Sequence, residues 1–148
     1  MMKKTIFLLF ITCFSIIFSQ QIKDNKRKKI VVDTLLKTEK SWDGIFYKQY
    51  PKGVPELSVL KIRIPPNTFL SWHIHLIPNA GYVESGEIIV EKQSDKQKRT
   101  IMKGEALAEI VDTYHRGYTG KKGAVLIVFY AGEKGVPLSI SKKISDFY

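Results

Sequence analysis

Hydrophobic and polar residues alternate over short segments of this chain, which is the pattern of β-strands with one buried face. In Leu57–Ile64, every second residue from Leu60 onward would face inward, and the lysine and arginine between them would face solvent. Gly86 is expected to form a turn between two strands. Further strands are expected over residues 30–36, 45–47, 69–75, 81–90, 104–118, 124–130 and 137–140.

The spacing of these segments predicts the fold class. They recur roughly every 8–12 residues, and no segment has a convincing helical period. Turn-forming residues such as Pro51-Lys52-Gly53 stand between them. The chain is therefore expected to be all-β, either a sandwich or a barrel, and closure into a barrel would hide the strand edges.

The first residues have a different pattern from the rest. Lys3 and Lys4 precede an apolar run, Thr5–Phe18, and the chain turns polar after Ser19. A positive start, an apolar centre and a small residue before polar sequence are typical of a secretory signal peptide. We therefore expect cleavage after Ser19 and a periplasmic or secreted protein.

Cleavage would divide the chain into a signal peptide (1–19), a flexible basic lead-in (20–29) and one β-barrel domain (30–148). The apolar run is shorter than the about 20 residues of a membrane span, so no span is expected after cleavage, although an uncleaved anchor is an alternative. Cys13, the only cysteine, lies inside the signal, and lipid attachment there is another alternative. The mature chain would have no disulfide and no thiolate ligand.

Charge limits the partners to be considered. The formal net charge is +10, and loss of Lys3 and Lys4 with the signal would leave +8. Much of the excess lies in residues 26–29 and 92–103, which are expected to be a solvated tail and a solvated hairpin. Attraction to anionic envelope lipid or an acidic glycan is the alternative. No nucleic-acid motif is visible, so nucleic acid is not an expected partner.

The candidate chemistry rests on histidine, of which the chain has three. His73 and His75 are two residues apart in an expected strand, so both rings project from one face. His115 follows after strands that could return it alongside them. Three neutral imidazoles suit Zn²⁺, Fe²⁺, Co²⁺, Ni²⁺ or Cu²⁺. An H-x-H pair alone can also arise by chance, with each ring bonded to the backbone.

The surroundings of this pair resemble the first motif of the cupin superfamily, G-x5-H-x-H-x3,4-E-x6-G. The corresponding segment, Asn67–Gly86, is NTFLSWHIHLIPNAGYVESG. His73, His75 and Gly86 match, whereas Asn67 replaces the opening glycine. Asn79 stands where the motif has its acidic ligand.

Residues Gly104–Thr119 resemble the second cupin motif, G-x5-P-x-G-x2-H-x3-N, with His115 in register. Ile110, Asp112 and Thr119 replace its proline, glycine and asparagine. The resemblance covers roughly residues 55–140. It implies a double-stranded β-helix, or jelly-roll barrel, of six to eight strands with a divalent metal inside. It also implies a homodimer formed through sheet edges.

Asn79 limits what the resemblance implies. An asparagine can offer a neutral carbonyl oxygen to the metal, or it can point away and cap the turn after Pro78. Three neutral imidazoles would leave the +2 charge uncompensated, which favours an anionic ligand and lowers the pKa of bound water. Such a site should hold Fe, Zn, Ni or Cu better than Mn, because Mn²⁺ prefers carboxylate oxygen.

Other polar and aromatic residues are weaker candidates. Glu84 and Glu109 are expected to be structural, Glu109 because a turn would break its strand parity with His115. Arg116 could attract an anion or simply lie on the surface. The candidate pocket aromatics, each of which could equally pack in the core, are Tyr47, Tyr82, Tyr114, Phe129 and Tyr130.

These features predict an exported metal-binding protein with a small-molecule pocket, and three hypotheses follow. A metal-dependent dioxygenase is favoured, because three imidazoles leave positions for substrate and dioxygen. A metal-assisted isomerase or lyase would need a general base, and no unpaired pocket carboxylate is evident from the sequence. A non-catalytic ligand- or metal-binding module is the third, and the altered second motif favours it. Cupin folds carry many functions, so the residues do not separate enzyme from binder. A degenerate barrel without a metal is the remaining alternative.

Overall fold

The computed structural model describes residues 29–143, so the expected signal peptide and most of the basic lead-in lie outside the described residues. All regular structure in the described part is β-strand, and the prediction of an all-β fold is confirmed. No helix there is long and apolar enough to cross a membrane.

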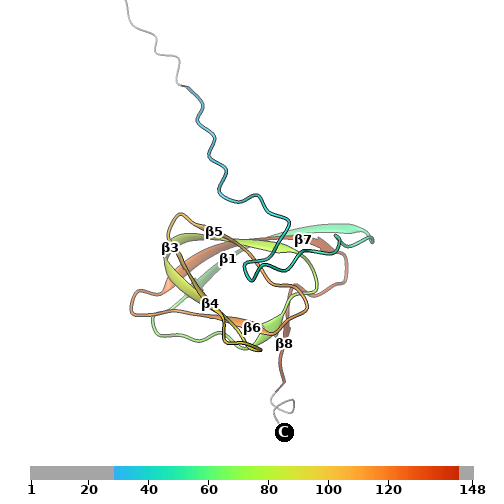
Figure 1. Ribbon diagram of the computed structural model, residues 1–148. Helices are drawn as coiled ribbons and strands as arrows, with labels where there is room; N and C mark the ends of the chain where they lie inside the picture. Colours follow the sequence, from blue (N-terminus) through green and yellow to red (C-terminus); the bar gives the residue numbers. More distant parts are fainter. Residues whose placement is uncertain (1–28, 144–148) are drawn as a thin grey trace, which may run out of the picture. The chain divides into compact units, whose positions relative to one another are not determined.

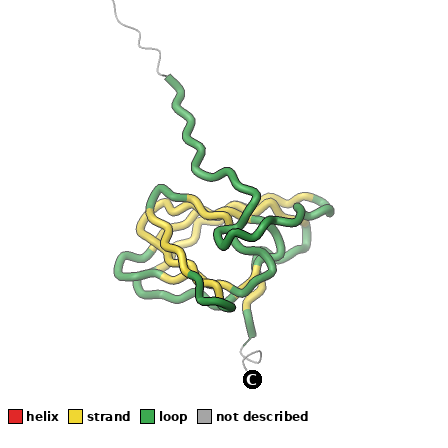
Figure 2. The backbone as a smooth tube through the Cα atoms, viewed as in Figure 1, coloured by secondary structure: helices red, strands yellow, loops and turns green. Residues whose placement is uncertain are grey.

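Eight antiparallel strands form two sheets that curl around a common interior (Figures 1 and 2). One sheet has the order β1-β7-β3-β5, and the other contains β3, β4, β6, β2 and β8. The strands are β1 (Pro55–Ile64), β2 (His73–Ile74), β3 (Asn79–Lys92), β4 (Lys98–Met102), β5 (Ala106–Ala108), β6 (His115–Tyr118), β7 (Ala124–Glu133) and β8 (Ile140–Ser141).

Strand β3 belongs to both sheets. The prediction of a turn between two strands at Gly86 was therefore wrong. The strand's first half pairs with β5 and β7, and its second half pairs with β4 and β6. A register shift between Val83 and Ser85 and a φ of +74° at Gly86 bend the strand where it changes sheet. A side chain at position 86 would meet the carbonyl oxygen of Gly123. The glycine therefore allows a bend within one strand.

The alternating pattern of β1 is confirmed at its C-terminal end. Ile64 is buried and Ile62 packs against the core, whereas Lys61 and Arg63 are exposed. Ile64 belongs to an apolar cluster drawn from both sheets, which fills one part of the interior. Its other buried members are Trp42, Val83, Ile88, Val90, Ile101, Leu107, Ile110 and Ala124.

The predictions of two strands near the start of the domain were wrong. Residues 30–36 form no strand, and their apolar side chains are exposed, up to 86% at Ile30. Residues 45–47 contribute a single bridge, between Phe46 and Lys40, because a turn at Gly44 reverses the chain at once. These apolar residues lack the neighbouring strands that would bury them.

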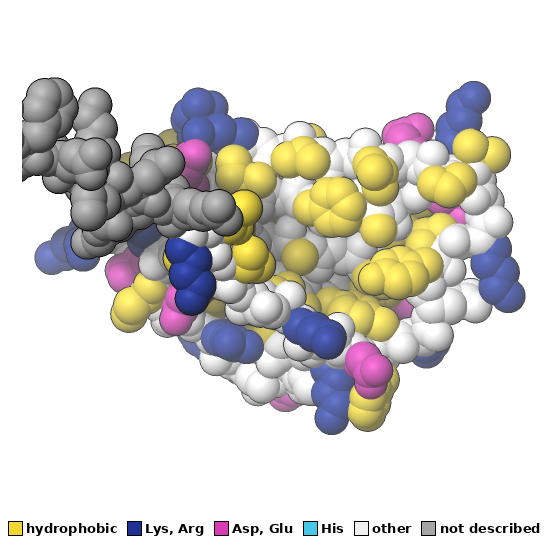
Figure 3. All heavy atoms as spheres, turned by 90° about the horizontal axis from the view of Figure 1, so that it is seen from above, with side chains coloured by type: hydrophobic (Ala, Val, Ile, Leu, Met, Phe, Trp, Pro, Cys, Tyr) yellow, Lys and Arg dark blue, Asp and Glu magenta, His cyan; other side chains and the backbone are white. Residues whose placement is uncertain are grey.

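The outer face of the β1-β7 pair is also apolar. Val59 of β1 lies opposite Phe129 of β7, and their exposed fractions are 65% and 42%. Figure 3, seen from the side of β5 and β7, shows hydrophobic side chains gathered on the surface, with basic groups mostly around them. A surface of this kind is typical of a contact face.

Candidate metal centre

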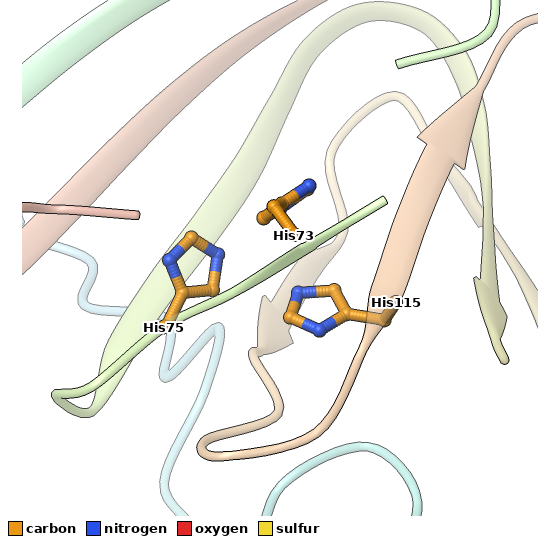
Figure 4. Close-up of side chains that lie close together, drawn as sticks. All are labelled: His73, His75 and His115. Atoms are coloured by element: carbon orange, nitrogen blue, oxygen red, sulfur yellow. The ribbon is translucent and has the colours of Figure 1, made fainter. Parts of the chain in front are cut away.

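The three histidines meet on the inner face of one sheet. His73 in β2 is the direct cross-strand neighbour of His115 in β6, and such neighbours project from the same face. His75 lies two residues beyond His73, so its ring turns the same way. The ring centroids are 4.6–5.1 Å apart, and one potential ligand atom from each ring lies within 4.8 Å of the others (Figure 4).

Each imidazole is oriented by a backbone carbonyl. The Nδ1 atoms of His73, His75 and His115 lie 2.8, 2.7 and 2.8 Å from the carbonyl oxygens of Ser71, Leu138 and Thr113. A carbonyl oxygen can only accept, so each Nδ1 carries the proton and donates it. Nε2 is then left with a free lone pair on all three rings. A carbonyl oxygen that accepts from the other ring nitrogen is usual for histidines that bind metals.

Burial keeps two of the rings neutral at physiological pH. His75 and His115 are 4% and 1% exposed, and burial lowers the pKa of each to about 4. The neutral imidazole is the form that binds a metal. A cation therefore need not displace protons from His75 or His115 at neutral pH.

The three rings line a cavity of about 370 Å³. Its wall is largely apolar, with Leu60 and Ile62 from β1 and Leu126 and Val128 from β7. The polar groups that share it with the histidines include Asn79, Glu109 and Tyr130. A mostly apolar hollow with a few convergent polar groups is the usual form of a small-molecule site.

Asn79 lies in this cavity but its role as a ligand stays a prediction. It is buried, and its Nδ2 donates to the carbonyl of Ile77 at 3.3 Å. Its Oδ1 has no hydrogen-bond partner among the described residues. The amide is thus anchored through its nitrogen, which leaves the oxygen free to accept or to ligate.

Glu109 was expected to be structural, yet it faces the same cavity. A turn around Asp112 does separate it from His115, but the chain folds back so that Glu109 Oε2 lies 3.5 Å from His115 Nε2. Burial raises the pKa of the Glu109 carboxyl. Strand alternation could not predict that Glu109 and His115 share a face, because the turn between β5 and β6 interrupts the alternation.

The remaining charged candidates, Glu84 and Arg116, are held in ion pairs. Glu84 pairs with Lys61 on the surface at 2.6 Å. Arg116 is bound by Glu91 at 2.8 Å and stacks over Trp72, so it is structural. Among the aromatic candidates that the sequence suggested, Tyr130 lines the cavity, and its ring centroid is 5.6 Å from that of His75.

The residues present fit a divalent cation. His115 Nε2, Asn79 Oδ1 and Glu109 Oε2 are all buried polar atoms without a hydrogen-bond partner in the described part of the chain. Such atoms are rare, because each costs about 1–3 kcal/mol of desolvation. All three can donate an electron pair, which is the property that a metal ligand needs.

Comparison with known proteins agrees with this architecture. No protein-family model matches the sequence, and no curated protein matches it. Solved structures do resemble the fold. The polyketide cyclase RemF from Streptomyces resistomycificus is 18% identical over 64% of this chain and 66% of its own, with a TM-score of 0.53. The DMSP lyase DddQ from Ruegeria pomeroyi is 14% identical over 58% and 43%, with a TM-score of 0.52.

A cupin-like protein from Thermotoga maritima also matches, at 14% identity over 58% of this chain and 64% of its own, with a TM-score of 0.50. Each match spans less than two thirds of the solved chain. Two curled sheets around convergent histidines define a small β-barrel whose interior could hold a metal. The chain shares its fold with this cupin-like protein, which is the fold that the resemblance of its two motifs implied.

Proposed function

We propose that this protein is an exported metalloprotein that holds one divalent transition-metal ion through His73, His75 and His115 and acts on a small molecule in the adjoining cavity. The observation that carries the proposal is that Nδ1 of each of the three rings lies 2.7–2.8 Å from a backbone carbonyl oxygen. Each donates Nδ1–H to a carbonyl, so three Nε2 lone pairs converge. Iron, zinc, nickel and copper suit such nitrogen ligands.

The test is elemental analysis of the mature protein purified from its own envelope. We expect about one metal ion per chain, and far less in His73→Ala and His115→Ala. Equal metal content in all three proteins would contradict the proposal. Recovery of the natural protein from an envelope fraction, with Gln20 as its first residue, would test export and the cleavage site.

Metal-dependent dioxygenase chemistry is the reaction class that we propose first. A redox-active ion would supply electron transfer to dioxygen. The chain's own part is to hold the ion through imidazoles and to exclude water with the apolar wall of β1 and β7. Oxygen uptake by the iron-, nickel- or copper-loaded protein with small phenols, thiols or diketones would support this class. Absence of uptake with all of them would count against it.

A second class, a metal-assisted isomerase or lyase, gains support from the structure. It needs a general base beside the metal, and Glu109 brings a carboxylate into the cavity that the sequence did not reveal. Turnover with redox-silent Zn²⁺ alone would favour this class. Ligand-dependent stabilisation without product would instead favour a binding module.

The ligand is proposed to be a small anion, and the protein a homodimer. A centre of neutral imidazoles keeps positive charge for an anionic group. Among the described strands, β1 pairs with β7 alone, and it carries exposed Leu57 and Val59. Strand β1 of a second copy could therefore join it antiparallel by an isologous contact. Light scattering should give a mass of two chains for the wild-type protein and of one chain for Val59→Lys.

A further inference from the structure

Glu109 is the direct cross-strand neighbour of Asn79. Strands β3 and β5 pair antiparallel, with Ala80 opposite Ala108. One step further along this register, the Glu109 amide donates to the Asn79 carbonyl at 3.0 Å. Cross-strand neighbours project from the same face of a sheet, and both side chains line the histidine cavity. A carboxylate therefore lies one strand away from the position where the first cupin motif has its acidic residue.

The backbone of Glu109 is fixed on both sides. Its amide is bound to Asn79, and its carbonyl accepts the Tyr47 hydroxyl at 2.6 Å. The side chain is 18% exposed, but Oε2 is inaccessible and has no hydrogen bond within the described residues. The atom that it faces, His115 Nε2, is unsatisfied as well.

The separation of these two atoms fits shared coordination. Ligands at about 2.1 Å from a tetrahedral ion lie about 3.4 Å apart, and Glu109 Oε2 is 3.5 Å from His115 Nε2. Once Glu109 is deprotonated, both atoms can donate an electron pair, and their separation allows one ion to bind both. Glu109 also lines the cavity that the three histidines line.

We infer that Glu109 is the fourth protein ligand of the metal centre and replaces, from the neighbouring strand, the carboxylate that Asn79 lacks. This inference rests on the proposed function. It changes the net charge of the loaded centre from +2 to +1 and adds an oxygen ligand. It therefore removes the sequence-based argument against Mn²⁺, which prefers carboxylate oxygen.

The experiment compares Mn²⁺ and Co²⁺ binding by the wild-type protein, Glu109→Gln and a matched control, Glu84→Gln. The control makes the same substitution at a surface residue that pairs with Lys61. We expect Glu109→Gln to weaken Mn²⁺ binding at least about 100-fold, beyond the roughly 10–100-fold typical of groups that only orient a ligand. Its Co²⁺ absorption spectrum should change, and Glu84→Gln should match the wild type in both measurements.

A rescue variant separates ligation from other roles. In the double variant Asn79→Glu/Glu109→Gln, the carboxylate moves across the strand pair to position 79, and we expect at least about tenfold recovery of Mn²⁺ affinity over Glu109→Gln. Thermal unfolding of the metal-free variants checks that they fold. If Glu109→Gln does not fold, the Mn²⁺ affinity of the double variant tests the ligand role. We expect this affinity to lie within about tenfold of the wild-type value.

The outcomes distinguish this inference from the proposed function. A wild-type protein that binds neither ion would overturn both. A wild-type protein that binds metal, with unchanged affinity and spectrum in Glu109→Gln, would overturn the ligand role alone. That second result, combined with loss of turnover, would make Glu109 a base and not a ligand.

Discussion

The interior of this barrel has two parts that are built on opposite principles. One part is the apolar cluster around Ile101, Leu107 and Val83, in which buried side chains fill the space between the sheets. The other is the cavity around His75 and His115, where polar atoms are buried without partners. The same strands serve both, since Ile88 and Val90 of β3 belong to the cluster and line the cavity.

The difference shows where stability and function are separated. Burial of a large apolar side chain contributes about 1.5–3 kcal/mol to folding, whereas an unsatisfied buried polar atom costs about 1–3 kcal/mol. The apolar cluster therefore stabilises the strands that hold the histidines in place. Changes in one part should affect folding, and changes in the other should affect metal binding.

The largest effect should come from a histidine. His115→Gln removes one of the three convergent nitrogens, and we expect metal affinity to fall at least about 1,000-fold, or about 4 kcal/mol, because the loss of a ligand cannot be replaced locally. The free energy of unfolding of the metal-free variant should differ from the wild-type value by much less than this. Chelator competition measures the first and chemical denaturation the second; retained affinity would contradict the assignment of the site.

The matching change in the apolar cluster is Ile101→Ala. Ile101 is 2% exposed, and loss of its buried side chain should lower the free energy of unfolding by about 3 kcal/mol, since the surrounding sheets can close only partly over the space. Metal affinity of the folded fraction should stay within a few-fold of the wild type. If the free energy of metal binding fell by as much as the free energy of unfolding, folding and metal binding would not depend on separate parts of the interior.

A third effect concerns pH. In the metal-free protein, burial lowers the pKa of His75 and His115 to about 4, against about 6.5 when unfolded. The unfolded chain binds more protons in this window, so stability is present above pH 6.5 and is lost as the pH falls toward 4. We expect a loss on the order of 3 kcal/mol for each of the two histidines, measured by denaturation with chelator present.

Glu109 opposes this loss, because its raised pKa means that the folded state holds an extra proton above the ordinary carboxyl range. Glu109→Gln should therefore make the acid destabilisation of the metal-free protein steeper. A shallower dependence in that variant would show that Glu109 adds to the acid destabilisation and does not oppose it.

The smallest effect should come from Asn79→Ala. Its Oδ1 is free but its amide is held by the Ile77 carbonyl, so it is at most a weak neutral ligand beside a carboxylate. We expect metal affinity to fall by less than about tenfold, measured by chelator competition. A loss as large as that of His115→Gln would make Asn79 a principal ligand and would leave Glu109 with a lesser role.

Some parts of the fold and the site were accessible from the sequence because they are local. The alternation in Leu57–Ile64 predicted β1 closely, and the H-x-H spacing predicted that two rings share a face. Residues 30–36 have the same apolar composition as a strand but remain exposed. A strand needs a neighbouring strand to pair with as well as an alternating pattern, and the pattern does not indicate which segment that neighbour is.

The sequence alone determined the all-β class, the two cupin motifs and the three histidines, because period-2 alternation and residue spacing act within a few residues of one another. Only the tertiary structure decided that Gly86 bends one strand between two sheets and does not end it. It also decided that Glu109 lies across from Asn79 and beside His115. Cross-strand register is set by pairing between distant segments and by the burial that this pairing allows, so it cannot be derived from either segment separately.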